Sequence, residues 1–302
     1  MTRERAGLAL GLLGVLAFSL TLPMTRVAVA ELDPWLVAFG RMAVAGLLAA
    51  GWLLWTGARA PARTYWKPLA WTAAGVVFGF PLCTSLAMQT LPAGQGAIVT
   101  GMLPLATAAL AARWFHERQP RRFWACALAG ALLVVGFALR DGVHALAAGY
   151  LWMLAAVGLA AVGYALGARA AATLGGGQVI LWVLVGALPV TLPAALWLAS
   201  TRPLQAGGVA WAGFAYVAVV SQLTGFFAWY NGLALGGIAR VGQVQLLQVF
   251  FTLAFAALLF GEPQPGSTWV VAGAVVALIV VGRSRNGPGQ AARAPERANA
   301  RT

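Results

Sequence analysis

Apolar stretches of about twenty residues recur along the chain, and the short polar connections between them carry most of the charged residues. A helix of about twenty apolar residues is long enough to cross the hydrocarbon core of a bilayer. The pattern therefore predicts ten membrane-spanning helices. We place these spans at residues 8–29, 35–56, 69–90, 95–115, 122–140, 149–169, 178–199, 209–233, 239–260 and 267–282.

The composition supports an all-α integral membrane protein. Of the 302 residues, 61% are hydrophobic and 9% are charged, whereas soluble domains carry roughly 25% charged residues. Ten spans leave no room for a separate soluble domain. The apolar run from Leu8 to Ala30 is longer than the core of a typical secretory signal, so we interpret it as the first span and not as a cleaved leader.

The positive charge is explained by membrane topology. The net charge is +13, but the basic residues lie at span ends and do not form the basic face of a nucleic-acid-binding protein. When connections are counted alternately, 16 of the 20 Lys and Arg residues fall on one side. Cytoplasmic connections carry such an excess, so we expect both termini to be cytoplasmic, in a bacterial inner membrane. The basic segment 283–302 has no apolar face and is predicted to be a disordered tail.

An internal repeat divides the chain. The motif Phe115–Pro120 (Phe-His-Glu-Arg-Gln-Pro) returns as Phe260–Pro265 (Phe-Gly-Glu-Pro-Gln-Pro) at an offset of 145 residues, and Trp124 and Trp269 follow at the same offset. We therefore expect five-span repeats at residues 1–145 and 146–282.

Five spans is an odd number, so the second repeat enters the membrane from the opposite side. Inverted repeats of this kind are typical of transporters that work by alternating access. A duplicated scaffold without transport activity is the alternative from another class.

A family resemblance adds to this interpretation. Leu32–Pro34, Ala38–Arg41 and Pro104-Leu105, together with Glu117 and the glycine-rich span behind it, resemble the EamA-type transporters of the drug/metabolite transporter (DMT) superfamily. The resemblance covers residues 8–282 and implies an exporter of small metabolites, with a cavity lined mainly by spans one, three, four, six, eight and nine.

Within the superfamily, the run Gln245–Thr252 is most similar to bacterial amino-acid exporters of the YddG type, which implies aromatic amino acids as substrates. Exporters of drugs or other metabolites are the alternative. The second repeat has Val249 where the first has Pro104, so we do not expect a symmetric pair of proline hinges.

Polar residues within spans are costly and often functional. Gln245, Gln248 and Thr252 follow a spacing of three and then four residues, which places them on one helical face. Thr100 and Thr107 hold the equivalent positions in span four. Amide side chains both donate and accept hydrogen bonds and so suit a zwitterionic amino acid. Hydrogen bonding between helices is the alternative role.

Other candidates lie in spans one, three, six and eight. Aromatic residues far from the membrane interface suit an apolar or aromatic substrate, with core packing as the alternative. Polar residues around Pro23 suit an interrupted helix that exposes backbone groups to a substrate. These further substrate-binding candidates are Trp229, Tyr230, Tyr164, Ser85, Ser19 and Met24.

Charged residues near span ends have predicted structural or gating roles. We expect Arg26 and Arg41 to extend toward the outer surface and to pair with Glu31 or Asp33. Binding of a substrate carboxylate is the alternative role for Arg41. Glu117 and Glu262, at the ends of spans four and nine, are expected to hold loop backbone or an arginine in place.

The distribution of titratable residues disfavours several other functions. No Asp or Glu lies in the middle of a span, and His116 and His144 fall in connections, so we expect a uniporter-like exporter without a proton relay. Cys83 and Cys126 are isolated within apolar stretches, which argues against a metal site. A lipid-modifying enzyme would need a catalytic constellation that the sequence lacks.

We therefore expect no enzyme activity, no cofactor and no nucleic-acid partner, with an amino acid and the lipid bilayer as partners. Gly163 and Gly167 have a spacing that suits close helix packing. We expect this packing to be internal, in a monomer.

Overall fold

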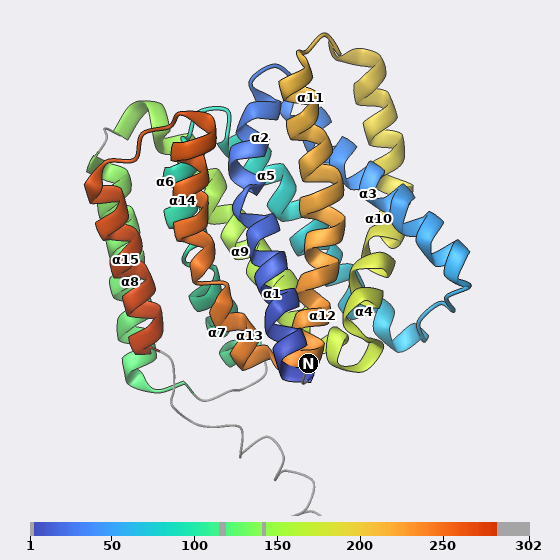
Figure 1. Cartoon of the computed structure of the whole chain (residues 1–302), viewed down its shortest axis with the longest axis horizontal. Coiled ribbons are helices and arrows are strands. Elements are labelled where there is room, and N and C mark those ends of the chain that lie inside the picture. Colours follow the sequence, from blue (N-terminus) through green and yellow to red (C-terminus); the bar gives the residue numbers. More distant parts are fainter. Residues whose placement is uncertain (1–2, 115–118, 141–142, 283–302) are drawn as a thin grey trace, which may run out of the picture.

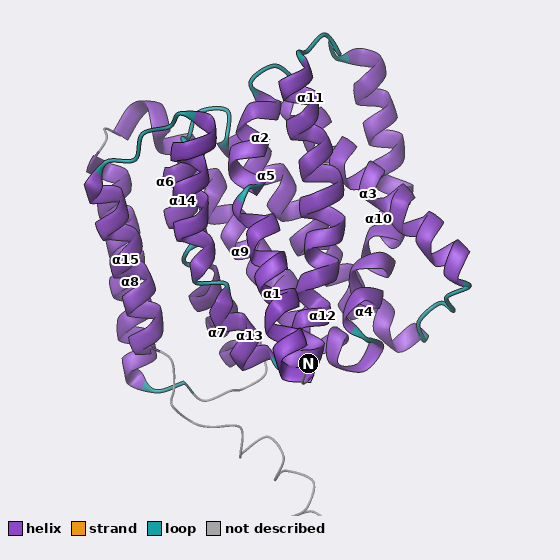
Figure 2. Ribbon diagram, in the orientation of Figure 1, coloured by secondary structure: helices purple, strands orange, loops and turns teal. Residues whose placement is uncertain are grey.

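The computed structural model describes residues 3–114, 119–140 and 143–282 and confirms an all-helical membrane architecture. The described residues form helices joined by short connections and include no strand (Figure 2). Among them, eight helical segments are long and apolar enough to cross a membrane. Helix α8 (Arg121–Arg140) and the shorter α15 (Gly266–Gly282) lie at the predicted fifth and tenth spans. The predicted tail 283–302 lies outside the described residues.

Several spans of the first half consist of more than one helical segment. In chain order, the helices before α8 are α1 (Arg3–Ser19), α2 (Thr21–Val29), α3 (Pro34–Thr56), α4 (Arg63–Thr72), η1 (Ala73–Gly79), α5 (Phe80–Ala87), α6 (Ala93–Thr100) and α7 (Leu103–Trp114). Here η1 is a π-helix in the middle of the third span. The fourth span is interrupted between α6 and α7.

The second half follows nearly the same plan. Its helices before α15 are α9 (Val143–Leu174), α10 (Gly176–Thr201), α11 (Gly208–Ala215), η2 (Tyr216–Gly225), α12 (Phe226–Gly236), α13 (Ile238–Val244) and α14 (Leu247–Phe260). Its third span again contains a π-helix, η2, and its fourth span is again interrupted, between α13 and α14. Because α9 begins at Val143, residue 144 lies in a helical turn and not in the connection where we expected it.

Packing between the halves follows a two-fold pattern. Helix α1 packs on α12, and α9 in the equivalent position packs on η1 and α5. Helices α3 and α10 pair with each other, as do α8 and α15, and α6 contacts α14. In Figure 1, α1 and α2 run away from the end of the molecule that carries the N-terminus, whereas α9 runs toward it. This arrangement is that of an inverted repeat.

Local sequence signals explain where the helices begin and break. Asp33 caps α3 by accepting hydrogen bonds from the backbone N–H groups of Trp35 (2.9 Å) and Leu36 (3.1 Å). Pro23 has no N–H, so it cannot donate to the carbonyl of Ser19 four residues earlier. The first span is accordingly interrupted at Leu20, between α1 and α2.

Glycines allow the closest contacts between the halves. A Cβ atom at Gly7 would collide with the backbone of Gly236, where α1 crosses α12. A Cβ atom at Gly75 of η1 would collide with the backbone of α9 near Gly163. As expected, Gly163 and Gly167 pack inside the chain, against η1, α4 and α12. Small residues let membrane helices approach at backbone distance, so both of these interfaces between the halves are unusually close.

Candidate functional site

A small cavity lies where the two interrupted fourth spans meet. Its volume is about 10 Å³, and α2, α6, α7 and α14 contribute to its walls, together with the α13–α14 break. This central cavity is lined by Thr100, Gln245, Gln248, Thr252, Leu22, Ala97, Gly101, Pro104, Leu246 and Val249. The structure thus brings four of the predicted polar residues to one space. A cavity of this size is at the lower limit for one water molecule, so the conformation is closed around it.

The hydrogen bonding of the polar lining is incomplete. The Thr100 hydroxyl donates to the carbonyl of Gly96 (2.9 Å). Gln245 is buried, and its amide nitrogen has no hydrogen-bond partner among the described residues. A buried donor without an acceptor is uncommon in proteins, so the cavity contains a group that a ligand oxygen can satisfy.

Both fourth spans are interrupted, although only the first has a proline there. In the first repeat Pro104 is the second residue of α7, whereas Val249 of the second repeat lies within α14. At the second break, backbone N–H groups donate to the carbonyl three residues earlier, as in a tighter helical turn. The N–H of Leu246 donates to Gln243 (3.1 Å) and that of Gln248 to Gln245 (3.0 Å). The interruption is therefore symmetric without a symmetric proline.

The predicted aromatic residues form a packed cluster. The ring of Trp229 lies 6.2 Å from that of Tyr164, and the rings of Tyr230 and Phe226 are 5.8 Å apart. The Trp229 indole nitrogen and the Tyr230 hydroxyl are buried without partners among the described residues. In this conformation none of the three predicted aromatics lines the central cavity.

The other predicted residues lie nearby or apart. Ser19 donates to the carbonyl of Val15 (2.7 Å) and lies 3.4 Å from the carbonyl of Gln248, so it is next to the central cavity. Met24 is half-buried and packs on the hydrophobic core. Ser85 is fully buried on α5, and its hydroxyl has no partner among the described residues. Neither Met24 nor Ser85 lines the central cavity.

The prediction that Arg41 extends to the outer surface is wrong. Its side chain is 1% exposed, and Nη2 donates to the hydroxyl of Ser221 on η2 (3.1 Å). The carboxylates expected to pair with it lie elsewhere. Glu31 accepts from the backbone of Gly207, and Asp33 forms an ion pair with Arg202 (3.4 Å). Because η2 packs directly on α3, it shields Arg41 and offers an acceptor at that depth.

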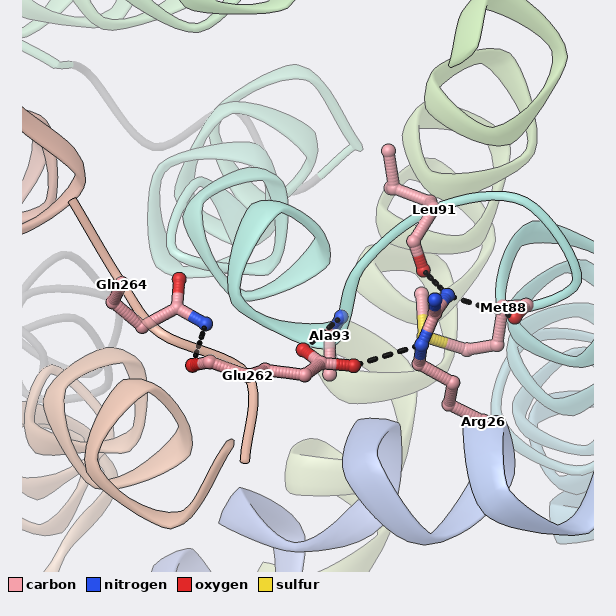
Figure 3. Close-up of polar contacts among 6 residues, drawn as sticks. All are labelled: Arg26, Met88, Leu91, Ala93, Glu262 and Gln264. Atoms are coloured by element: carbon pink, nitrogen blue, oxygen red, sulfur yellow. Dashed lines mark hydrogen bonds and ion pairs between the residues drawn. The ribbon is translucent and has the colours of Figure 1, made fainter. Parts of the chain in front are cut away.

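Arg26 and Glu262 join the two halves (Figure 3). They belong to α2 and to the α14–α15 connection, which reach the end of the molecule opposite the N-terminus (Figure 1). Arg26 Nε lies 2.7 Å from Glu262 Oε1, and Arg26 Nη1 donates to the carbonyl of Leu91 (2.7 Å). Glu262 Oε2 accepts from the backbone N–H of Ala93, at the start of α6 (3.0 Å).

Glu262 therefore contacts an arginine and the backbone at the start of α6, where an arginine or loop backbone was expected. The expected pairing of Arg26 with Glu31 or Asp33 is wrong, because the α14–α15 connection approaches Arg26 more closely. Glu117 lies outside the described residues.

A larger cavity of about 530 Å³ lies at this same end of the molecule. We call it the vestibule, and it is lined by Arg26, Pro92, Gln95, Phe137, Gly261, Glu262, Pro263, Gln264, Pro265, Ser267 and Thr268. Gln95 and Gln264 were not predicted from the sequence. One signal was present, since Gln264 and Gln119 hold the same position of the repeated motif.

The chemistry of these cavities is hydrogen bonding. Within the ranges that the structure describes, no cluster of His, Cys, Asp and Glu could hold a metal ion. The two cysteines, Cys83 and Cys126, are buried and free. The central cavity offers amide and hydroxyl groups, and the vestibule adds the guanidinium of Arg26 and the carboxylate of Glu262.

Inverted helical halves that meet at interrupted helices define a membrane transporter. The chain belongs to the EamA-like transporter family, whose model matches residues 5–139 and again residues 147–282. It is 41% identical over 283 residues to the "Uncharacterized transporter YdeK" of Bacillus subtilis (strain 168), covering 94% of this chain and 99% of that protein. A solved crystal structure shares the fold, with a TM-score of 0.62 at 18% identity, over 92% of this chain and 97% of that one.

Proposed function

We propose that the protein exports neutral amino acids, aromatic ones included, by alternating access. The observation that carries this proposal is the central cavity, where Gln245 presents a buried amide nitrogen without a partner among the described residues. Thr100, Gln248 and Thr252 add hydroxyl and amide groups around it. Such uncharged donors and acceptors match a zwitterion, which has no net charge. The rocking units are residues 1–145 and 146–282.

Transport follows the substrate gradient and needs no proton gradient. The acidic residues that the structure describes lie at helix ends or in connections, at Glu4, Glu31, Asp33 and Glu262. The lining of the central cavity contains amides and hydroxyls and no group that titrates near neutral pH. A proton coupled to transport would need such a group along the path.

The protein works as a monomer in the bacterial inner membrane, with both termini in the cytoplasm. The start of α1 and the end of α15 lie at the same end of the molecule (Figure 1). The described α3–α4 and α9–α10 connections, which are among those counted as positive along the sequence, lie toward this end (Figure 1). The vestibule and the Arg26–Glu262 ion pair are then on the periplasmic side, and export ends there.

Counterflow in liposomes tests the proposal. Purified protein is reconstituted with unlabelled amino acid inside, and labelled Phe, Met, Thr or Gln is added outside without an ion or pH gradient. We expect saturable exchange, strongest for Phe, at a rate that an imposed pH gradient does not change. No exchange of any of the four by folded protein overturns an amino-acid substrate, and a strong dependence on the pH gradient overturns the uncoupled mechanism.

A further inference from the structure

Arg41 is a cation buried within the second span and is not neutralised by any described carboxylate. Glu262 pairs with Arg26 and Asp33 with Arg202, while Glu31 accepts from the backbone of Gly207. Arg41 makes one hydrogen bond, to Ser221, and its Nε and Nη1 atoms are buried without a partner among the described residues. A guanidinium in this setting is costly unless an anion or several acceptors satisfy it. The fold therefore holds a charged hydrogen-bond donor within a membrane span without enough acceptors for it.

The interruption of the first span lies next to this cation. The hydroxyls of Thr21 and Ser221 are 2.8 Å apart, so Ser221 links Arg41 to the first residue of α2. On the other side of the break, α1 ends at Ser19, whose carbonyl lacks a donor at Pro23. The Arg41 cation and a carbonyl without its helical donor thus lie near one break, an arrangement that suits a zwitterion.

The next residue of η2 adds an unfilled acceptor. Gln222 donates through Nε2 to the carbonyl of Val76 on η1 (3.1 Å), while its buried Oε1 has no partner among the described residues. Isolated π-helical turns are rare and often occur at functional sites. Arg41 contacts η2 and has two nitrogen atoms without an acceptor, and Gln222 is a residue of η2 and has one oxygen atom without a donor.

We infer that Arg41 binds the carboxylate of the transported substrate and that Gln222 accepts a hydrogen bond from its ammonium group. This inference rests on the proposed function and narrows the substrate to α-amino acids with a free carboxylate. Leu22, the neighbour of Thr21, lines the central cavity, so the interrupted first span separates that cavity from Arg41. The first span moves aside at the break when substrate binds, and the closed conformation described above reforms in its absence.

Competition by four similar phenyl compounds tests whether the wild-type transporter recognises the carboxylate of its substrate. Counterflow of labelled Phe is measured against unlabelled Phe, 3-phenylpropanoate, phenylalaninamide and phenethylamine. The first two have a carboxylate, and the last two have an amino group without one. We expect the carboxylate to improve competition at least about tenfold, the usual scale of one charge-assisted hydrogen-bonded pair. Equal competition by Phe and phenylalaninamide overturns the inference.

Variants assign the effect to Arg41. Arg41→Gln is expected to abolish the preference for carboxylates, and Arg41→Lys to retain part of it because the charge stays in place. Arg202→Gln, which removes a basic residue at the end of α10, is the control and is expected to keep the full preference. Gln222→Leu is expected to weaken competition by Phe and by phenethylamine and to leave competition by 3-phenylpropanoate unchanged. This variant tests the inference if neither Arg41 variant folds.

The outcomes separate this inference from the proposed function. If Phe exchanges normally and folded Arg41→Gln keeps the full carboxylate preference, the inference is wrong and amino-acid export stands. A Gln222→Leu variant that weakens all four compounds equally also contradicts it. If folded wild-type protein exchanges no amino acid, the proposed function fails and this inference fails with it.

Discussion

Gln245 is the residue whose substitution most directly tests the central cavity. Replacing it with Leu keeps the volume similar but removes the amide that is buried without a partner. Loss of one hydrogen bond to substrate is expected to cost about 1 kcal/mol, which raises the half-saturation concentration for Phe exchange about fivefold.

Gln243→Leu is the matched control, because this side chain is exposed and lies two residues earlier in the same span. We expect Phe exchange by Gln243→Leu to be like that of the wild type. Equal loss in the two variants would show that the substitutions act through folding and not through the cavity.

Arg26 and Glu262 are expected to act as a gate between the central cavity and the vestibule, on the periplasmic side in the proposed orientation. Glu262→Gln removes the ion pair and weakens the hold on the start of α6 at Ala93, so the central cavity opens more often toward the vestibule. The measurement is the labelling rate of a cysteine placed at Thr100, with Cys83 and Cys126 replaced, by a membrane-impermeant maleimide added from the periplasmic side. We expect faster labelling in Glu262→Gln.

Two further variants show whether the effect belongs to this ion pair. Arg202→Gln breaks the pair with Asp33 and is expected to leave labelling of the Thr100 position unchanged. The charge-reversed pair Arg26→Glu with Glu262→Arg is expected to restore part of the slow labelling. Labelling that is unaffected by Glu262→Gln argues against a gate.

At the scale of residues, the sequence predicted which side chains share a helical face better than it predicted which side chains contact each other. The helical spacing of Gln245, Gln248 and Thr252 was enough to place them together on one wall. The partners of Arg26 and Arg41 were not predicted, because Glu262 and Ser221 come from the other half of the chain. Such pairings depend on how whole helices pack, and hydropathy along the sequence does not encode this.

At the scale of helices, hydropathy located the spans to within a few residues at most ends. The third span is shifted, from the predicted 69–90 to helices that begin at Arg63 and end at Ala87, because the turn before Pro92 ends it early. The π-helices η1 and η2 were not predicted, since an extra residue in a turn leaves the apolar pattern almost unchanged.

The contact between α9 and η1 allows a test at this scale. A Cβ atom at Gly163 would lie 2.6 Å from a side-chain carbon of Val76 and 3.0 Å from the backbone nitrogen of Val76. Gly163→Ala is therefore expected to destabilise the protein by about 1–3 kcal/mol. The measurements are the midpoint of thermal unfolding in detergent, which we expect to fall, and the rate of Phe exchange, which we expect to be slower.

Gly158 provides the control on the same helix. A Cβ atom there meets nothing within 4 Å, so Gly158→Ala is expected to leave the unfolding midpoint unchanged or raise it slightly, because Ala favours helix over Gly. An equal fall in both variants would indicate a general effect of substitution on α9 and not a close interface.

For the whole molecule, the odd number of spans in each repeat predicted the inverted arrangement before any packing was known. The same reasoning predicts the orientation in the membrane. A fluorescent protein that folds only in the cytoplasm, fused after Thr302, is expected to fluoresce, and alkaline phosphatase at the same place is expected to be inactive. The opposite pattern would place the termini outside and reverse the direction of the gate.

The glycine-lined contacts of α1 with α12 and of α9 with η1 have a mechanical consequence. Interlocked side chains must change rotamer before two helices can slide, whereas smooth backbone surfaces can shift with little rearrangement. Both contacts lie between the two halves of the chain, so we expect one half to slide along the other at these places. We therefore expect the rate of the transport cycle to depend more on opening of the Arg26–Glu262 pair than on the sliding of the helices.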